Sequence, residues 1–154
     1  MKKTLITLAF LTSILVSSFA QKTYVWKSYN IQVTVPDDFR EKKNTNKEFD
    51  MKGDGMELSI LIHEENVAID DLDDAAIAGA KAMNLQEIDA AHRVSINEFE
   101  GFYVEGFKDG HRIMFACLGN PSSHTNFFII VTFDDNDKVA EKDALGIINS
   151  LDVL

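Results

Sequence analysis

The most regular pattern in the chain is a set of three apolar stretches separated by short polar segments. They cover residues 101–108, 111–118 and 125–133. Apolar runs of this length between turn residues are typical of strands, so we expect three consecutive antiparallel strands at the centre of one sheet. The third run is apolar at successive positions, which predicts a strand that is covered on both faces.

The turn between the first two stretches predicts their register. Asp109-Gly110 suits a type I′ turn, because both central residues of that turn have positive φ. A two-residue turn places Phe102 opposite Cys117, and the face that carries both is expected to be the core side. Glu105 and Arg112 then lie on the other face as diagonal neighbours, close enough to form an ion pair.

Shorter patterns predict further strands on the N-terminal side of these three. Their expected bounds are residues 23–29, 31–35, 48–52, 56–63 and 87–96. In the second of these, apolar and polar side chains alternate, which is typical of a half-buried strand. The segment 40–47 is polar and charged, and we expect it to be a mobile connection.

Two segments carry small or apolar residues at helical spacing, which predicts two amphipathic helices. The first covers about residues 71–83, with Asp70 as its N-cap and Asn84 in the left-handed position that closes it. The second begins after the acidic cluster 134–137, which caps it, and ends near Leu151. Together these elements predict an α+β fold, in which an antiparallel β-sheet of about six to seven strands carries two packed helices.

Residues 1–20 have the pattern of a secretory signal peptide. Two lysines precede an apolar run, and Ser18-Phe19-Ala20 has small residues at the two positions that a signal peptidase reads. We expect cleavage before Gln21, which leaves residues 21–154 as a single α+β domain in the periplasm or outside the cell. The alternative is an N-terminal membrane anchor, but the run is short and hydroxyl-rich for a membrane span.

The charge of the chain narrows the classes of partner. Removing the two lysines of the predicted signal peptide leaves 13 basic residues against 25 acidic ones, a net charge of −12. Phosphate binding depends on clustered Lys and Arg, so nucleic acid and anionic lipid surfaces are disfavoured. The acidic surplus favours solubility and, more weakly, cationic partners. No stretch of the mature chain has the length and hydrophobicity of a transmembrane segment.

Residues that could carry chemistry form no recognisable catalytic or metal-binding motif. Cys117 is the only cysteine, so an internal disulfide is excluded, and it faces the apolar side in the expected register. The histidines lack the spacing of helical metal ligands. They are His63, His92, His111 and His124. The cluster 134–137 lacks the glycine and glutamate of an EF-hand loop. We therefore expect no metal, no cofactor and no enzymatic activity.

The most site-like segment is the polar loop 119–126. It is long for a hairpin and lies between two rigid strands, a setting in which binding residues are often found. The candidate binding residues in it are Asn120, Ser122, Ser123, His124 and Asn126. The alternative, which we prefer, is an ordinary irregular turn, because most such loops only connect strands.

Short motifs along the chain resemble those of a known family. Residues 29–39 contain a Tyr-x-Ile-x-Val strand followed by Pro-x-x-Phe, a later strand contains Glu100-Gly101-Phe102, and the last helix ends in Ile148-Asn149-Ser150-Leu151. This order resembles the PsbP-like and DcrB-like group of small α/β/α sandwich domains, which also includes Ran-binding relatives. The resemblance implies an antiparallel sheet with helices on its faces. It also implies an accessory or binding role, and it supplies no catalytic motif.

The leading function hypothesis is a non-catalytic, secreted or periplasmic module that binds a protein or another envelope component. One alternative is a carrier of a small apolar ligand, which needs a cavity between the aromatic-rich sheet and a helix. The other, less favoured, is a hydrolase that uses Ser122, Ser123 and His124, although the GxSxG motif is absent.

Overall fold

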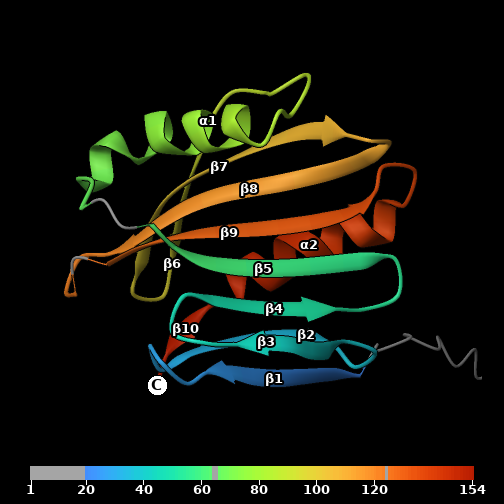
Figure 1. Cartoon of the computed structure of the whole chain (residues 1–154), viewed down its shortest axis with the longest axis horizontal. Helices are drawn as coiled ribbons and strands as arrows, with labels where there is room; N and C mark the ends of the chain where they lie inside the picture. The colour runs from blue at the N-terminus through green and yellow to red at the C-terminus, as the bar shows by residue number, and fades with distance from the viewer. Residues whose placement is uncertain (1–19, 64–65, 124) are drawn as a thin grey trace, which may run out of the picture.

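The computed structural model describes residues 20–63, 66–123 and 125–154 (Figure 1). Within these ranges, ten strands and two α-helices form an α+β fold with two antiparallel sheets. The seven-stranded sheet has the order β3-β4-β5-β9-β8-β7-β6, and the three-stranded sheet has the order β1-β2-β10.

The larger sheet consists of β3 (Arg40–Asn44), β4 (Glu48–Lys52), β5 (Met56–His63), β6 (His92–Ile96), β7 (Phe99–Lys108), β8 (His111–Asn120) and β9 (Thr125–Asp134). The smaller one consists of β1 (Gln21–Trp26), β2 (Ile31–Pro36) and β10 (Asp152–Val153). The helices are α1 (Leu72–Ala82) and α2 (Lys138–Asn149). Helix α1 lies over β7 and β8 on one face of the larger sheet, while α2 lies on the opposite face between β9 and β2 (Figure 1).

The register predicted for the central hairpin is confirmed. Asp109 and Gly110 both have positive φ, 53° and 81°, and Phe102 pairs with Cys117 across β7 and β8. The diagonal pair also forms, with Arg112 Nη1 2.9 Å from Glu105 Oε2. A local turn signal was therefore sufficient to align two ten-residue strands.

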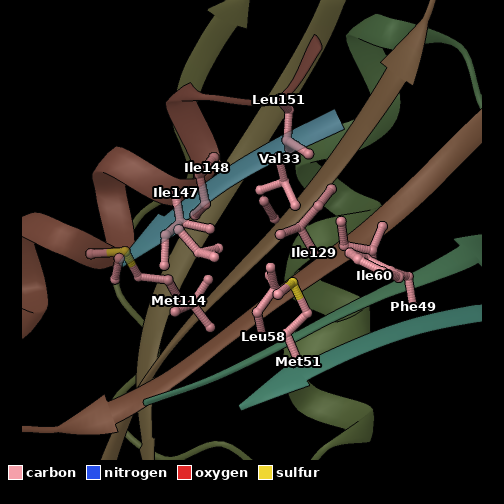
Figure 2. Close-up of a cluster of buried hydrophobic side chains, with 14 of the residues drawn as sticks. Val33, Phe49, Met51, Leu58, Ile60, Met114, Ile129, Ile147, Ile148 and Leu151 are labelled. Atoms are coloured by element: carbon pink, nitrogen blue, oxygen red, sulfur yellow. The ribbon is translucent and has the colours of Figure 1, made fainter. Parts of the chain in front are cut away.

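The expectation of one core side is only half right, because both faces of the hairpin are covered. The face with Phe102 and Cys117 packs under α1. The opposite face, with Met114 and Leu118, belongs to the larger cluster of buried residues. Figure 2 shows that cluster, in which side chains of β2, β4, β5, β8, β9 and α2 point toward one another. The predicted two-sided cover of the third strand is accordingly confirmed.

Both predicted helices are present, with one correction at the start of α1. The N-cap of α1 is Asp71 and not Asp70, because the chain first makes a 3₁₀ turn at Ile69–Asp71. Asn84 closes the helix with a φ of 61°, as predicted. Helix α2 begins as the acidic cluster predicted, with Asp137 Oδ1 accepting hydrogen bonds from the N–H groups of Val139 and Ala140.

The segment expected to be mobile is instead the edge strand β3, and this is the largest correction to the expected fold. Arg40 pairs with Lys52 and Asn44 with Phe49, with a bulge after Glu41. Edge strands often carry charged residues, which protect the sheet edge from pairing with other chains. The polar sequence of this segment therefore gave no strand pattern. Asn44 Nδ2 also donates to the Val25 carbonyl at 3.0 Å, which joins the two sheets.

Other expected bounds also change. The first strand ends at Trp26, and a turn of four residues connects it to β2. The strand expected over residues 87–96 is regular only from His92. Strand β10 has only two residues and no sequence pattern of its own. The expected α+β fold, an antiparallel sheet of six to seven strands with two packed helices, is confirmed. A separate three-stranded sheet accompanies the seven-stranded one.

Candidate functional site

The predicted binding loop uses two of its candidate residues for folding. Asn120 and Asn126 are both buried, at 7% and 3% exposure. Asn120 Oδ1 accepts a hydrogen bond from the N–H of Ser122 at 2.8 Å, which shapes the turn. Asn126 Nδ2 donates to the Val67 carbonyl at 3.2 Å and so ties the loop to the segment before α1.

The remaining candidates of that loop are exposed or fall outside the structure. Ser122 and Ser123 are solvent-exposed. The Ser123 hydroxyl lies 3.4 Å from the N–H of Thr125. His124 lies outside the described residues. A binding role for these three side chains therefore stays a prediction.

Cys117 lies in an apolar cluster beneath α1 and has no exposed surface. Burial raises the pKa of its thiol to about 12, so the sulfur is protonated at neutral pH. A thiolate is the nucleophilic form, and this environment disfavours it. The position matches the apolar face expected for Cys117.

The three histidines that the structure describes lie on three different strands. His92 Nε2 is 3.0 Å from Asp89 Oδ2, and its ring stacks on Tyr103. His63 packs on the ring of Phe128, with 4.4 Å between the ring centroids. In the described part of the chain, no three His, Cys, Asp or Glu side chains are grouped so that they could hold a metal ion.

Arg112 is the centre of a charge network that includes three acidic residues, Glu105, Asp135 and Glu141. Its Nη1 and Nε atoms lie 2.9 Å from Glu105 and Asp135, respectively. Its guanidinium also lies over the ring of Phe107, 5.2 Å from the centroid. Burial lowers the pKa of Arg112, but the hydrogen bonds to both carboxylates outweigh burial and raise it. These contacts connect β7 and β8 to the segment before α2, which is a structural role.

A groove of about 540 Å³ lies at one end of the two sheets, where three distant parts of the chain meet. Its walls are the turn after β2, the turn between β4 and β5, and the first turn of α2 (right-hand side of Figure 1). Five of the lining residues are aspartates, namely Asp37, Asp38, Asp54, Asp137 and Asp143. None of the described residues that line the groove is basic.

The floor of the groove is apolar and its walls are fixed. Phe39, Met56 and Ala140 are buried beneath it, whereas Val139 is 53% exposed. Val139 is one of two large apolar side chains that the described residues leave exposed. Gly53 allows the turn between β4 and β5 to sit on Phe39, because a Cβ there would overlap the Phe39 ring.

The turns are also joined directly to each other across the groove. Asp38 Oδ2 accepts a hydrogen bond from the N–H of Asp54 at 2.5 Å. Burial raises the pKa of Asp143, and the neighbouring Asp137 and Asp38 raise it further, against an opposing effect of Lys142. The groove is therefore a preformed, electronegative surface. The sequence did not indicate it, because its walls come from three separate segments, residues 36–39, 54–56 and 137–143.

The void in the apolar core is much smaller. It measures about 10 Å³ and is lined by side chains that include Ile31, Phe99 and Phe127. That volume holds about one water-sized probe, whereas ligand pockets typically measure hundreds of cubic ångströms. Neither helix in the described ranges has the length and hydrophobicity needed to cross a lipid bilayer.

No family model and no curated protein matches the sequence. Solved structures of similar fold include the Ran-binding protein Mog1p of Saccharomyces cerevisiae, with a TM-score of 0.59 and 9% identity over 88% of this chain and 96% of that one. LpqN of Mycobacterium tuberculosis, described as involved in cell envelope biogenesis, aligns with a TM-score of 0.50 and 15% identity over 84% of this chain and 87% of that one.

A protein from Bacteroides thetaiotaomicron aligns with a TM-score of 0.53 and 16% identity over 86% of this chain. The alignment spans only 48% of that protein's own length. At these identities the likeness establishes the fold alone, which is that of a small antiparallel-sheet domain. The Ran-binding protein Mog1p thus shares the fold of this chain. Membership of the PsbP-like and DcrB-like group stays a prediction.

Proposed function

We propose that this chain is a non-catalytic, exported binding or accessory module whose partner is a protein or another component of the cell envelope. The observation that carries the proposal is the preformed groove, which combines an exposed apolar side chain with a rim of carboxylates. Such a combination is suited to recognition, since apolar contact supplies affinity and charge supplies specificity. By contrast, Cys117 is sealed and Asn120 and Asn126 are occupied in folding.

The neighbours in fold are consistent with this proposal. Mog1p is described as a Ran-binding protein, and LpqN as involved in envelope biogenesis. Both descriptions apply to those proteins. Domains with this fold therefore include a Ran-binding protein and a protein involved in envelope biogenesis, which supports the class that we propose for this chain.

Export is proposed from the sequence of residues 1–20. Strand β1 begins at Gln21, directly after the expected cleavage site, so cleavage would leave every strand and helix of the described residues intact. The hydrogen bond from the N–H of Asp37 to the Ala20 carbonyl would be lost. Sequencing the N-terminus of the protein recovered from a periplasmic or extracellular fraction tests this step. A mature chain that starts at Gln21 supports export, whereas an intact Met1 contradicts cleavage.

The alternatives have less support from the structure. An apolar carrier requires a cavity of ligand size, and the core void between the sheet and β2 is about 10 Å³. A hydrolase at the 119–126 loop requires an activated nucleophile, whereas the hydrogen bonds of Ser122 and Ser123 to described residues lie within their own turn.

The experiment is chemical cross-linking of the tagged mature protein in an envelope extract, followed by quantitative mass spectrometry. A partner enriched reproducibly over an unrelated acidic domain, together with no turnover across a panel of esters, peptides and glycosides, is the expected result. Turnover that disappears in Ser122→Ala or His124→Ala, with no enriched partner, would replace the binding proposal with the hydrolase alternative.

A further inference from the structure

The groove has the chemistry of a docking site for one class of polypeptide. We propose that it binds a segment of a partner protein in which lysine or arginine residues flank an exposed apolar side chain. This inference rests on the proposed binding function and specifies its surface and the kind of partner. Two features of the groove indicate the chemistry of its partner. They are an exposed apolar side chain and the negative charge on the rim.

The exposed apolar side chain of the groove is Val139, in the first turn of α2. It is 53% exposed although it borders the buried side chains Phe39 and Met56. A partner side chain laid against Val139 would remove apolar surface from water on both molecules, which favours association. Because the adjacent floor is already packed, that contact needs no rearrangement of the core.

The rim of the groove carries negative charge that the basic residues of this chain balance only in part. In the described residues, the carboxylates of Asp37, Asp54 and Asp143 take part in no salt bridge. Two basic side chains, Lys22 and Arg40, lie beside the rim, where both donate to the backbone carbonyl oxygen of Asp37.

Burial is the largest cause of the raised pKa of Asp143. Lys142 lowers this pKa, and repulsion by the charges of Asp137 and Asp38 raises it further. A cationic group that enters the groove relieves this repulsion, so it favours the ionised carboxylates. The charge complementarity is therefore with ammonium or guanidinium groups spread along a segment.

Other occupants fit the groove less well. A second copy of this chain would bring the same five aspartates face to face, and like charges at an interface oppose association. The chain as a whole has a net charge of −10, which adds to that repulsion. A single divalent ion fits less well, because no three carboxylates of the described residues are grouped so that they could hold a metal ion.

The test is an NMR titration of the ¹⁵N-labelled mature protein with synthetic peptides. The probe is acetyl-Gly-Ser-Lys-Leu-Arg-Ser-Gly-amide, and its matched controls replace leucine by serine or both basic residues by glutamate. We expect saturable shifts confined to the amides of residues 37–39, 54–56 and 137–143. We expect weaker binding by the serine peptide and none by the glutamate peptide.

Two variants with the same change in charge test whether peptide binding depends on the rim of the groove. Asp37→Asn/Asp54→Asn/Asp143→Asn removes three rim charges and should weaken binding about fivefold or more. Asp70→Asn/Asp71→Asn/Asp74→Asn removes three charges at the start of α1, far from the groove, and should leave the affinity within about twofold. A third variant, Val139→Ser, alters an exposed side chain and should weaken the leucine peptide while leaving the serine peptide unchanged.

Three results would overturn the assignment. They are no detectable binding at millimolar peptide, equal weakening by both triple variants, or saturable shifts at the groove with calcium chloride but not with peptide. Failure of the groove and failure of the proposed function are separable. If a captured partner binds the rim variant as tightly as the wild type, the groove is not the binding surface, but the proposed binding function stands. If the protein turns over a substrate and still binds the peptide, the non-catalytic function is wrong, but the groove assignment stands.

Discussion

Gly79 of α1 lies so close to Phe115 of β8 that a Cβ at position 79 would overlap the aromatic ring. This contact sets the distance between the helix and the sheet, and it explains the small residues on the buried stripe of α1. Leu72, Ala76 and Ala80 complete that stripe and have no exposed surface. Cys117 is sealed beneath the same helix.

Gly79→Ala should therefore destabilise the protein although alanine is the better helix former. We expect a loss of about 1–3 kcal/mol in the free energy of unfolding from overpacking, which exceeds the gain of about 1 kcal/mol in helix propensity. Urea denaturation followed by circular dichroism measures the difference. Gly146→Ala on α2 is the matched control, since a Cβ there meets nothing within 4 Å, and it should stabilise slightly. Equal effects of the two substitutions would contradict the close approach.

The start of α2 gives a second prediction. Asp137→Ala removes the side chain that accepts hydrogen bonds from Val139 and Ala140, and it should cost about 0.5–2 kcal/mol of stability. Asp71→Ala at the start of α1 removes a residue that makes no side-chain cap bond, so the loss should be smaller. Thermal unfolding of the two variants side by side tests this order. A larger loss for Asp71→Ala would be inconsistent with the observed caps.

The Arg112 network gives a third prediction. Arg112→Met leaves Glu105 and Asp135 without their donor, and we expect a loss of about 1–3 kcal/mol. Lys52→Met breaks the pair with Glu57, in which both side chains are 56% exposed, and should change stability by less than about 0.5 kcal/mol. Denaturant midpoints of both variants in low and high salt provide the measurement. If the Lys52 variant were the less stable one, Arg112 would not be the centre of the network.

The pH dependence of stability tests the electrostatics of the groove. A carboxyl whose pKa is raised on folding stabilises the folded state when protonated, and this contribution is lost as the pH rises through its folded-state pKa. Asp143→Asn should therefore raise the melting temperature slightly at pH 7 and leave it unchanged near pH 3. Asp74→Asn, at the start of α1 where the helix dipole favours negative charge, should lower it at pH 7. A melting temperature lowered at pH 7 by Asp143→Asn would contradict the raised pKa.

Local signals in the sequence predicted the elements that local physics controls. The turn at Asp109-Gly110 aligned β7 with β8, and the acidic cluster before residue 138 located the start of α2. Strand β3 was not predicted, because an exposed edge strand does not need alternating apolar and polar residues. The two-residue strand β10 forms only because the end of the chain lies beside β2.

The site shows the same division. The 119–126 loop was conspicuous in the sequence because its polar residues are contiguous, and yet Asn120 and Asn126 are used to hold the turn. The groove was inconspicuous because Asp38, Asp54 and Asp143 meet only after the chain has folded. The single signal that pointed toward it was the acidic net charge, which favoured cationic partners without locating them.

The most direct test of the whole account compares the proteins captured by cross-linking with the wild type, the rim variant Asp37→Asn/Asp54→Asn/Asp143→Asn and the α1 variant Asp70→Asn/Asp71→Asn/Asp74→Asn. All three carry the same tag, and their folding is matched by circular dichroism. The account predicts a partner that is depleted with the rim variant and retained with the α1 variant. A partner retained equally by all three would contradict the claim that this groove is the binding surface.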